Sequence, residues 1–270
     1  MVVTAPPSAR SLLGVLHEHR RLLFELVRRD IRSRFAGARF GLLWSLINPA
    51  VQLAAYSLIF GYIYTSGTRP RGAVTSSLFC GLWPWWAFQE GLMRGTGALV
   101  EQASLLRRIP MPAVLPVFAA TLSAIAIQML GFGLFLVVFA GIGAVELRVE
   151  WLLLPALVAV LLAITAGMAL VLAPLYLVAR DVMYTVNLAL TVGFFFSPVL
   201  YQLDYLPAQL RAVATLNPLA GVLGLFRTCV LGDAWPPLLA LLMLGGTIAG
   251  VWNLGARLMA RVAGRIDEYC

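Results

Sequence analysis

The few ionisable side chains that lie inside apolar sequence are where this chain could perform chemistry. Glu90 and Arg94 stand four residues apart within residues 77–99, a segment that holds no other charge. This spacing places both side chains on one face of a helix, and charges in apolar surroundings are costly unless they are paired. The spacing therefore predicts an intrahelical ion pair that faces protein or water. We interpret it as a packing pair that fixes the orientation of the helix, with a proton relay as the alternative.

Arginines form the second set. All 20 basic residues are arginine, and the net charge is +8. A basic chain can indicate nucleic acid, but arginines beside apolar segments are typical of membrane topology and headgroup contact, so no nucleic-acid partner is expected. As a helix, residues 10–36 carry Leu23, Phe24, Val27, Ile31 and Phe35 on one face and Arg21, Glu25, Arg28, Arg29 and Arg32 on the other, with Arg20 and Arg34 as exceptions. This pattern predicts an interface helix whose apolar face lies among lipid headgroups.

Motifs for other chemistry are missing from the sequence. It contains no phosphate-binding loop of the form GxxxxGK[ST], no HExxH zinc pattern and no GxSxG nucleophile elbow. The three cysteines, Cys80, Cys229 and Cys270, show no metal-ligand spacing, and a Cys80–Cys229 disulfide stays open as an alternative. We therefore expect no catalytic, cofactor-binding or metal site in this chain.

The composition predicts an integral membrane protein. Charged residues make up 12% of the chain, against roughly 25% in soluble domains, while 61% of residues are hydrophobic and the mean hydropathy is +0.88. The predicted fold is a single all-α domain over residues 1–270, with six transmembrane helices, the interface helix and a re-entrant helical hairpin at residues 207–231. The six spans are placed at residues 42–65, 77–99, 113–142, 151–179, 182–201 and 237–256.

The arginines also orient the chain. If the N-terminus lies inside, fourteen of the 20 arginines fall on the inner side and five on the outer side. This bias satisfies the positive-inside rule, and an even number of spans then places both termini in the cytoplasm.

Several short motifs, in this order and spacing, resemble the membrane subunits of ABC transporters that export polysaccharide, the ABC-2 type permeases for O-antigen, capsule and teichoic acid. The resemblance covers nearly the whole chain. It is carried by Arg29-Asp30-Ile31 with Arg32, Arg34 and Phe35, Phe40-Gly41-Leu42-Leu43-Trp44 before Pro49, Gly81-Leu82-Trp83-Pro84-Trp85, Leu105-Leu106-Arg107-Arg108-Ile109-Pro110 before Leu115-Pro116, Arg180-Asp181, Ser197-Pro198-Val199-Leu200-Tyr201, Leu206-Pro207, Asn217-Pro218-Leu219 and Arg227.

The resemblance implies a multi-pass protein of the bacterial plasma (inner) membrane that forms a homodimer and works with two copies of a cytoplasmic ABC ATPase. That partner would bind ATP and Mg, and the substrate would be a lipid-linked polysaccharide. By resemblance, the element that couples to the ATPase is Leu105, Leu106, Arg107, Arg108, Ile109 and Pro110. The arginines of the interface segment would either hold the pyrophosphate of the lipid carrier or only anchor the helix: Arg28, Arg29, Arg32, Arg34 and Arg39.

Aromatic side chains are frequent in the predicted spans. They either pack against neighbouring helices and lipid, or line a channel in which sugar rings slide along the faces of the aromatic rings. The candidates for a channel at the dimer interface are Tyr56, Phe60, Trp83, Trp85, Trp86, Phe88, Phe195 and Tyr201.

Two other functions compete with polysaccharide export. One is an ABC-2 exporter of a lipid or a drug, and the other is a membrane enzyme that acts on lipid-linked sugars. The enzyme would turn over its substrate as a purified chain, whereas the permease would need its partner ATPase.

Overall fold

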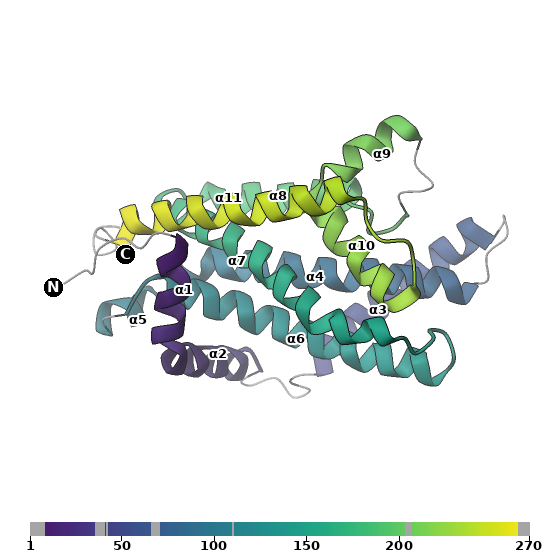
Figure 1. Cartoon of the computed structure of the whole chain (residues 1–270). Helices are drawn as coiled ribbons and strands as arrows, with labels where there is room; N and C mark the ends of the chain where they lie inside the picture. Colours follow the sequence, from purple (N-terminus) through teal and green to yellow (C-terminus); the bar gives the residue numbers. More distant parts are fainter. Residues whose placement is uncertain are drawn as a thin grey trace.

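A computed structural model of the chain describes residues 9–35, 41, 43–65, 71–109, 111–202 and 207–263. Within these residues every regular element is helical (Figure 1). The elements are α1 (Ala9–Glu18), α2 (Arg20–Phe35), α3 (Leu43–Thr65), α4 (Arg71–Glu101), α5 (Ala103–Arg108), α6 (Val114–Gly141), the 3-10 helix η1 (Val149–Leu153), α7 (Leu154–Val178), α8 (Asp181–Phe196), α9 (Ala208–Thr215), α10 (Pro218–Leu231) and α11 (Leu238–Ala263).

Four of these helical stretches are long and apolar enough to cross a membrane. They cover Leu43–Tyr62, Val114–Gly141, Val149–Val178 and Leu238–Val262. The other two predicted spans correspond to α4, whose sequence is more polar, and to α8, which has 16 residues and is shorter than a typical span. The all-helical fold is confirmed among the described residues, and the count of six spans stays a prediction.

Helix α4 forms the centre of the bundle. It packs against α3, α5, α6, α7, α8 and α10. The indole N–H of Trp83 donates to the Gln128 carbonyl oxygen of α6 at 2.7 Å, and the Phe79 ring stacks on Phe132 with 4.7 Å between centroids. Because protein surrounds α4 on most sides, its small and polar residues meet other helices instead of lipid.

Three of the predicted channel aromatics belong to this core, and the assignment of aromatic residues to a channel stays a prediction. Trp83, Trp85 and Phe88 expose 2% or less of their surface, because α4 is enclosed by its neighbours. Burial cannot be read from residue type, since the same side chains suit a core and a channel wall. In contrast, Phe195 on α8 exposes 65% of its surface. The remaining candidates are partly buried: Tyr56, Phe60, Trp86 and Tyr201.

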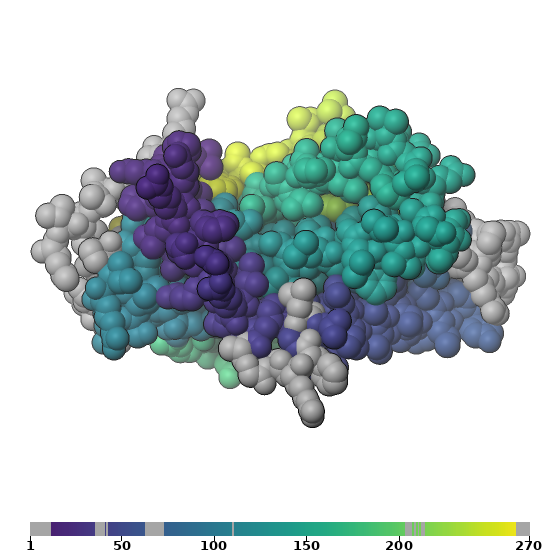
Figure 2. Space-filling model, turned by 90° about the horizontal axis from the view of Figure 1, so that it is seen from below, coloured from purple at the N-terminus to yellow at the C-terminus, as the bar shows by residue number. Residues whose placement is uncertain are grey.

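The single interface helix expected at residues 10–36 is two helices, α1 and α2, which run in different directions (Figure 1). The break lies at His19, whose backbone N–H donates to the Val15 carbonyl oxygen at 3.0 Å and whose ring Nδ1 lies 3.1 Å from the same oxygen. Part of the apolar side of α2 faces protein: α2 packs on α6, Leu23 and Val27 pack partly buried against the core, and Leu26 is buried, whereas Phe24 is exposed. Figure 2 shows α1 and α2 as one band across the surface of the bundle.

The segment expected to form a hairpin contains the two short helices α9 and α10. Asn217 caps α10, because its Oδ1 accepts from the Leu219 backbone N–H at 3.0 Å. Arg227, buried in α10, donates to the carbonyl oxygens of Val199 and Tyr201 at 3.0 and 3.1 Å, so it holds the turn that follows α8. Cys80 and Cys229 are both buried free thiols, so they do not form the disulfide left open by the sequence.

Candidate functional site

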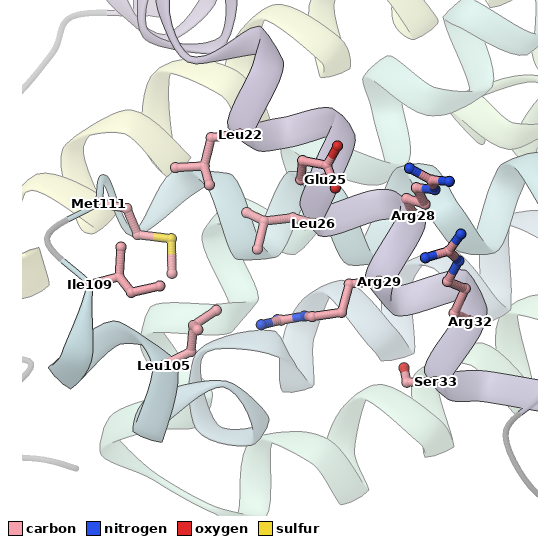
Figure 3. A pocket seen from close by; sticks show the side chains of 10 residues that line it. All are labelled: Leu22, Glu25, Leu26, Arg28, Arg29, Arg32, Ser33, Leu105, Ile109 and Met111. Atoms are coloured by element: carbon pink, nitrogen blue, oxygen red, sulfur yellow. The ribbon is translucent and has the colours of Figure 1, made fainter.

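One end of the bundle gathers the elements that carry the predicted ATPase-coupling residues and most of the predicted interface arginines. Figure 1 shows α1, α2, α5 and the C-terminal end of α11 there, with α9 and α10 toward the opposite end. A groove of about 600 Å³ lies between α2 and the α5 region. It is lined by Leu22, Glu25, Leu26, Arg28, Arg29, Arg32, Ser33, Leu105, Ile109 and Met111 (Figure 3).

The groove combines apolar and basic walls. Leu22 and Leu26 of α2 face Leu105, Ile109 and Met111 across it. Of the three arginines at its α2 edge, Arg29 points toward α5, whereas Arg28 and Arg32 point to the other side of α2 (Figure 3). Arg29 reaches across, and its Nη2 donates to Gln102 Oε1, just before α5, at 2.8 Å. Arg28 and Arg32 are exposed and stand four residues apart, a spacing at which like charges repel and an anion between them is favourable. This arrangement can hold a group that joins hydrocarbon to a phosphate.

The structure therefore joins two residue sets that the sequence only placed on the same side of the membrane. From the set expected to couple to an ATPase, Leu105 and Ile109 line the groove, Leu106 packs partly buried against the core, and Arg107 and Arg108 are exposed. From the set expected to meet pyrophosphate, three line the same groove: Arg28, Arg29 and Arg32. Arg39 and Pro110 lie outside the described residues.

The intrahelical pair expected between Glu90 and Arg94 is not formed in this structure, because both side chains pair with α2. The Nη2 atom of Arg94 donates to both carboxylate oxygens of Asp30, at 2.7 and 2.8 Å. Glu90 forms an ion pair with Arg34. The physical reason is that α2 packs on α6, which is the neighbour of α4, so that Asp30 and Arg34 of α2 reach the opposite charges of α4. Arg34 therefore faces the bundle in this structure.

Two polar side chains of α6 complete this network. The Ser123 hydroxyl donates to Asp30 Oδ2, and Gln128 Nε2 donates to Glu90 Oε2 at 2.5 Å. The four charged side chains expose between 12% and 29% of their surface, so their charges are only partly screened by solvent. Sequence reasoning missed Asp30, Ser123 and Gln128. The available signal was Arg34, which lies on the apolar side of the helical wheel and therefore needed a partner there.

The opposite end carries a separate, partly exposed pair between α6 and α7. Arg148 Nη2 lies 3.3 Å from Glu150 Oε1. This pair lies in a different part of the fold from the groove.

Comparison with known proteins agrees with this architecture. Residues 21–231 match the family model described as ABC-2 type transporter. The chain is 27% identical over 240 residues to the O-antigen export system permease protein RfbA of Myxococcus xanthus, covering 85% of this chain and 89% of that protein. It is 25% identical over 217 residues to RfbA of Klebsiella pneumoniae, covering 78% and 79%. It is also 25% identical over 203 residues to the polysialic acid transport protein KpsM of Escherichia coli, covering 75% and 78%.

The family match spans most of the chain, and the structure supplies several helices that are long and apolar enough to cross a bilayer. The chain is thus a multi-pass membrane protein that belongs to the ABC-2 type transporter family.

Proposed function

We propose that this chain is the permease subunit of an exporter that moves a lipid-linked polysaccharide across the bacterial plasma membrane. The observation that carries the proposal is its similarity, over three quarters or more of its length, to permeases named for O-antigen export and polysialic acid transport. In the proposed arrangement the chain crosses the membrane six times, with both termini in the cytoplasm, and the α9–α10 hairpin lies in the outer leaflet.

ATP hydrolysis is assigned to a separate cytoplasmic ATPase, two copies of which would bind a homodimer of this chain. The proposed contact is α5 with its flanking residues, where Arg107 and Arg108 are exposed and form no ion pair with the residues that the structure describes. Exposed arginines are suited to pair with acidic groups of a partner. The proposed channel runs along the homodimer interface, with exposed Phe195 and the partly buried Tyr56 and Phe60 as its aromatic lining.

The groove between α2 and α5 is proposed to receive the pyrophosphate end of the lipid carrier. Its apolar walls suit the first isoprenoid or acyl carbons, and Arg28 and Arg32 suit the phosphates. Because these arginines are exposed, their loss should not disturb packing.

Arg28→Ala/Arg32→Ala is therefore expected to raise the substrate concentration for half-maximal export by about tenfold, with the folded amount unchanged, since a charge pair at an exposed site contributes up to about 1 kcal/mol. The matched control is Arg20→Ala/Arg21→Ala, which removes two exposed arginines from the start of the same helix. Equal effects of the two variants would count against a phosphate site in the groove.

Depletion of this chain in its own bacterium tests the proposed function. We expect lipid-linked polysaccharide to accumulate in the cytoplasmic leaflet and surface polysaccharide to disappear, as measured by mass spectrometry of extracted lipids and by surface labelling. Normal surface polysaccharide together with an altered phospholipid or drug profile would favour a different ABC-2 substrate.

A further inference from the structure

Two ion pairs between α2 and α4 hold α2 on the bundle. Each helix contributes to these pairs one acid and one base that stand four residues apart: Asp30 and Arg34 on α2, Glu90 and Arg94 on α4. The pairs cross between the helices in opposite order, so that Asp30 meets Arg94 and Arg34 meets Glu90. In this docked state every one of the four charges has a partner of opposite sign on the other helix.

The same four charges have a second complete pairing. An acid four residues before a base is the favourable orientation for an ion pair within one helix, and both helices satisfy it. If α2 leaves α4, Asp30 can pair with Arg34 and Glu90 with Arg94, and no charge is left alone in a region of low dielectric. If one helix carried both acids and the other both bases, the pairs would anchor α2 equally well. When α2 then left α4, each helix would keep two like charges without a partner of opposite sign.

The other contacts of α2 are compatible with such a movement. Among its residues with described burial only Leu26 is fully buried, whereas α6 buries much of its length. Ser123 and Gln128, which donate to the two acids, can also accept hydrogen bonds, so they can follow a change of partner. Because α2 is one wall of the groove and α5 belongs to the other, a displacement of α2 changes the width of the groove.

We propose that Asp30, Arg34, Glu90 and Arg94 form a partner-exchange latch: they position α2 against α4 and α6 when paired across the helices, and they permit α2 to move away when paired within each helix. The latch therefore controls access to the groove between α2 and α5. The part of this inference that concerns export rests on the proposed function, and the part that concerns the movement of α2 does not.

Three variants with the same net charge separate the two pairings. Asp30→Arg/Arg34→Glu, the helix swap, keeps the pair within α2 but places like charges against α4. Asp30→Arg/Arg94→Asp, the cross swap, keeps both pairs between the helices but leaves each helix with two like charges of its own. Reversal of all four charges, Asp30→Arg/Arg34→Glu/Glu90→Arg/Arg94→Asp, restores both pairings.

The first measurement is the distance between spin labels on Ser33→Cys and Ser104→Cys, two exposed positions on α2 and α5, in lipid nanodiscs. The native cysteines are replaced by alanine. We expect the wild type to show a major docked population and a minor longer distance. The helix swap should lower the ratio of docked to undocked protein at least about tenfold, and the cross swap should show the docked distance alone. The fourfold reversal should restore both populations, with fewer undocked molecules than in the wild type because the base now precedes the acid in each helix.

The second measurement is export. The cross swap is expected to be folded, docked and at least about tenfold slower, because its undocked state brings like charges together, and the fourfold reversal should recover most of the rate. If the cross swap exports at the wild-type rate, the proposed exchange of partners is overturned, and the four charges only anchor α2 in one position. If the wild-type distance distribution is as narrow as that of the cross swap, the proposed exchange of partners is overturned without any transport assay. If the helix swap has the same distance distribution as the wild type, these ion pairs do not hold α2 in place. If the helix swap fails to fold, the cross swap, which keeps every pair of the docked state, still decides the question.

Discussion

Gly95→Leu is expected to prevent the folded subunit from accumulating. A Cβ atom at this position of α4 would lie 2.3 Å from Thr121 Oγ1 of α6 and 2.6 Å from the Ala169 Cβ of α7. Both are closer than van der Waals contact, and both neighbours are fully buried, so neither can move without displacing a helix. Overpacking of this kind costs about 3 kcal/mol or more, because two helices would have to separate from α4 at once.

Gly133→Leu on α6 is the matched control, since a Cβ atom there meets nothing within 4 Å. The measurements are the monodisperse fraction in size-exclusion chromatography and the unfolding temperature in detergent. Gly133→Leu should keep both near the wild-type values, while Gly95→Leu should lose most of the monodisperse protein. Similar behaviour of the two variants would contradict the close crossing of α4, α6 and α7 in this structure.

Arg107→Glu/Arg108→Glu is expected to abolish ATP-driven export by a folded subunit. Both arginines are exposed at the end of α5, so the change leaves the packing of the chain intact. On the proposed surface for the ATPase, each reversal replaces an attraction with a repulsion, and charge pairs at interfaces contribute on the order of 2–5 kcal/mol each. The partner ATPase should therefore fail to copurify, and the export rate should fall at least about a hundredfold.

Arg107→Lys/Arg108→Lys keeps both charges and serves as the control, with copurification and export expected near wild type. The unfolding temperature of the reversed variant should match that of the wild type, which separates lost coupling from lost folding. Normal export by the reversed variant would remove α5 from the coupling role.

The positions of most helices could be predicted from the sequence, because a long uncharged run bounded by arginine, glycine or proline leaves few other places for a membrane helix to begin and end. The expected span at residues 113–142 is α6 at Val114–Gly141, and the one at 182–201 begins within one residue of α8. Local patterns also indicated two short helices after α8, since Pro207 and Pro218 divide that segment. These features depend on neighbouring residues in the chain, which the sequence shows directly.

The ion-pair partners of the partly buried charges could not be predicted in the same way. The spacing of Glu90 and Arg94 fits an intrahelical pair, and only the packing of α2 beside α4 and α6 decides that Asp30 and Arg34 bind them instead. Likewise, the type of residue does not show that Trp83 is enclosed at the centre of the bundle while Phe195 is exposed. Both outcomes depend on contacts between segments that lie far apart in the sequence.

The most direct measurement of the proposed function is polysaccharide transport in vesicles that contain this subunit and its partner ATPase. Lipid-linked polysaccharide from the producing strain would be added to the vesicle membrane, with ATP and Mg on the side of the ATPase. We predict that the polymer becomes protected from an external glycosidase only when both proteins and hydrolysable ATP are present. Protection or chemical change of the polymer by this chain alone, or no ATP-dependent protection with both proteins, would contradict the assignment as a permease subunit.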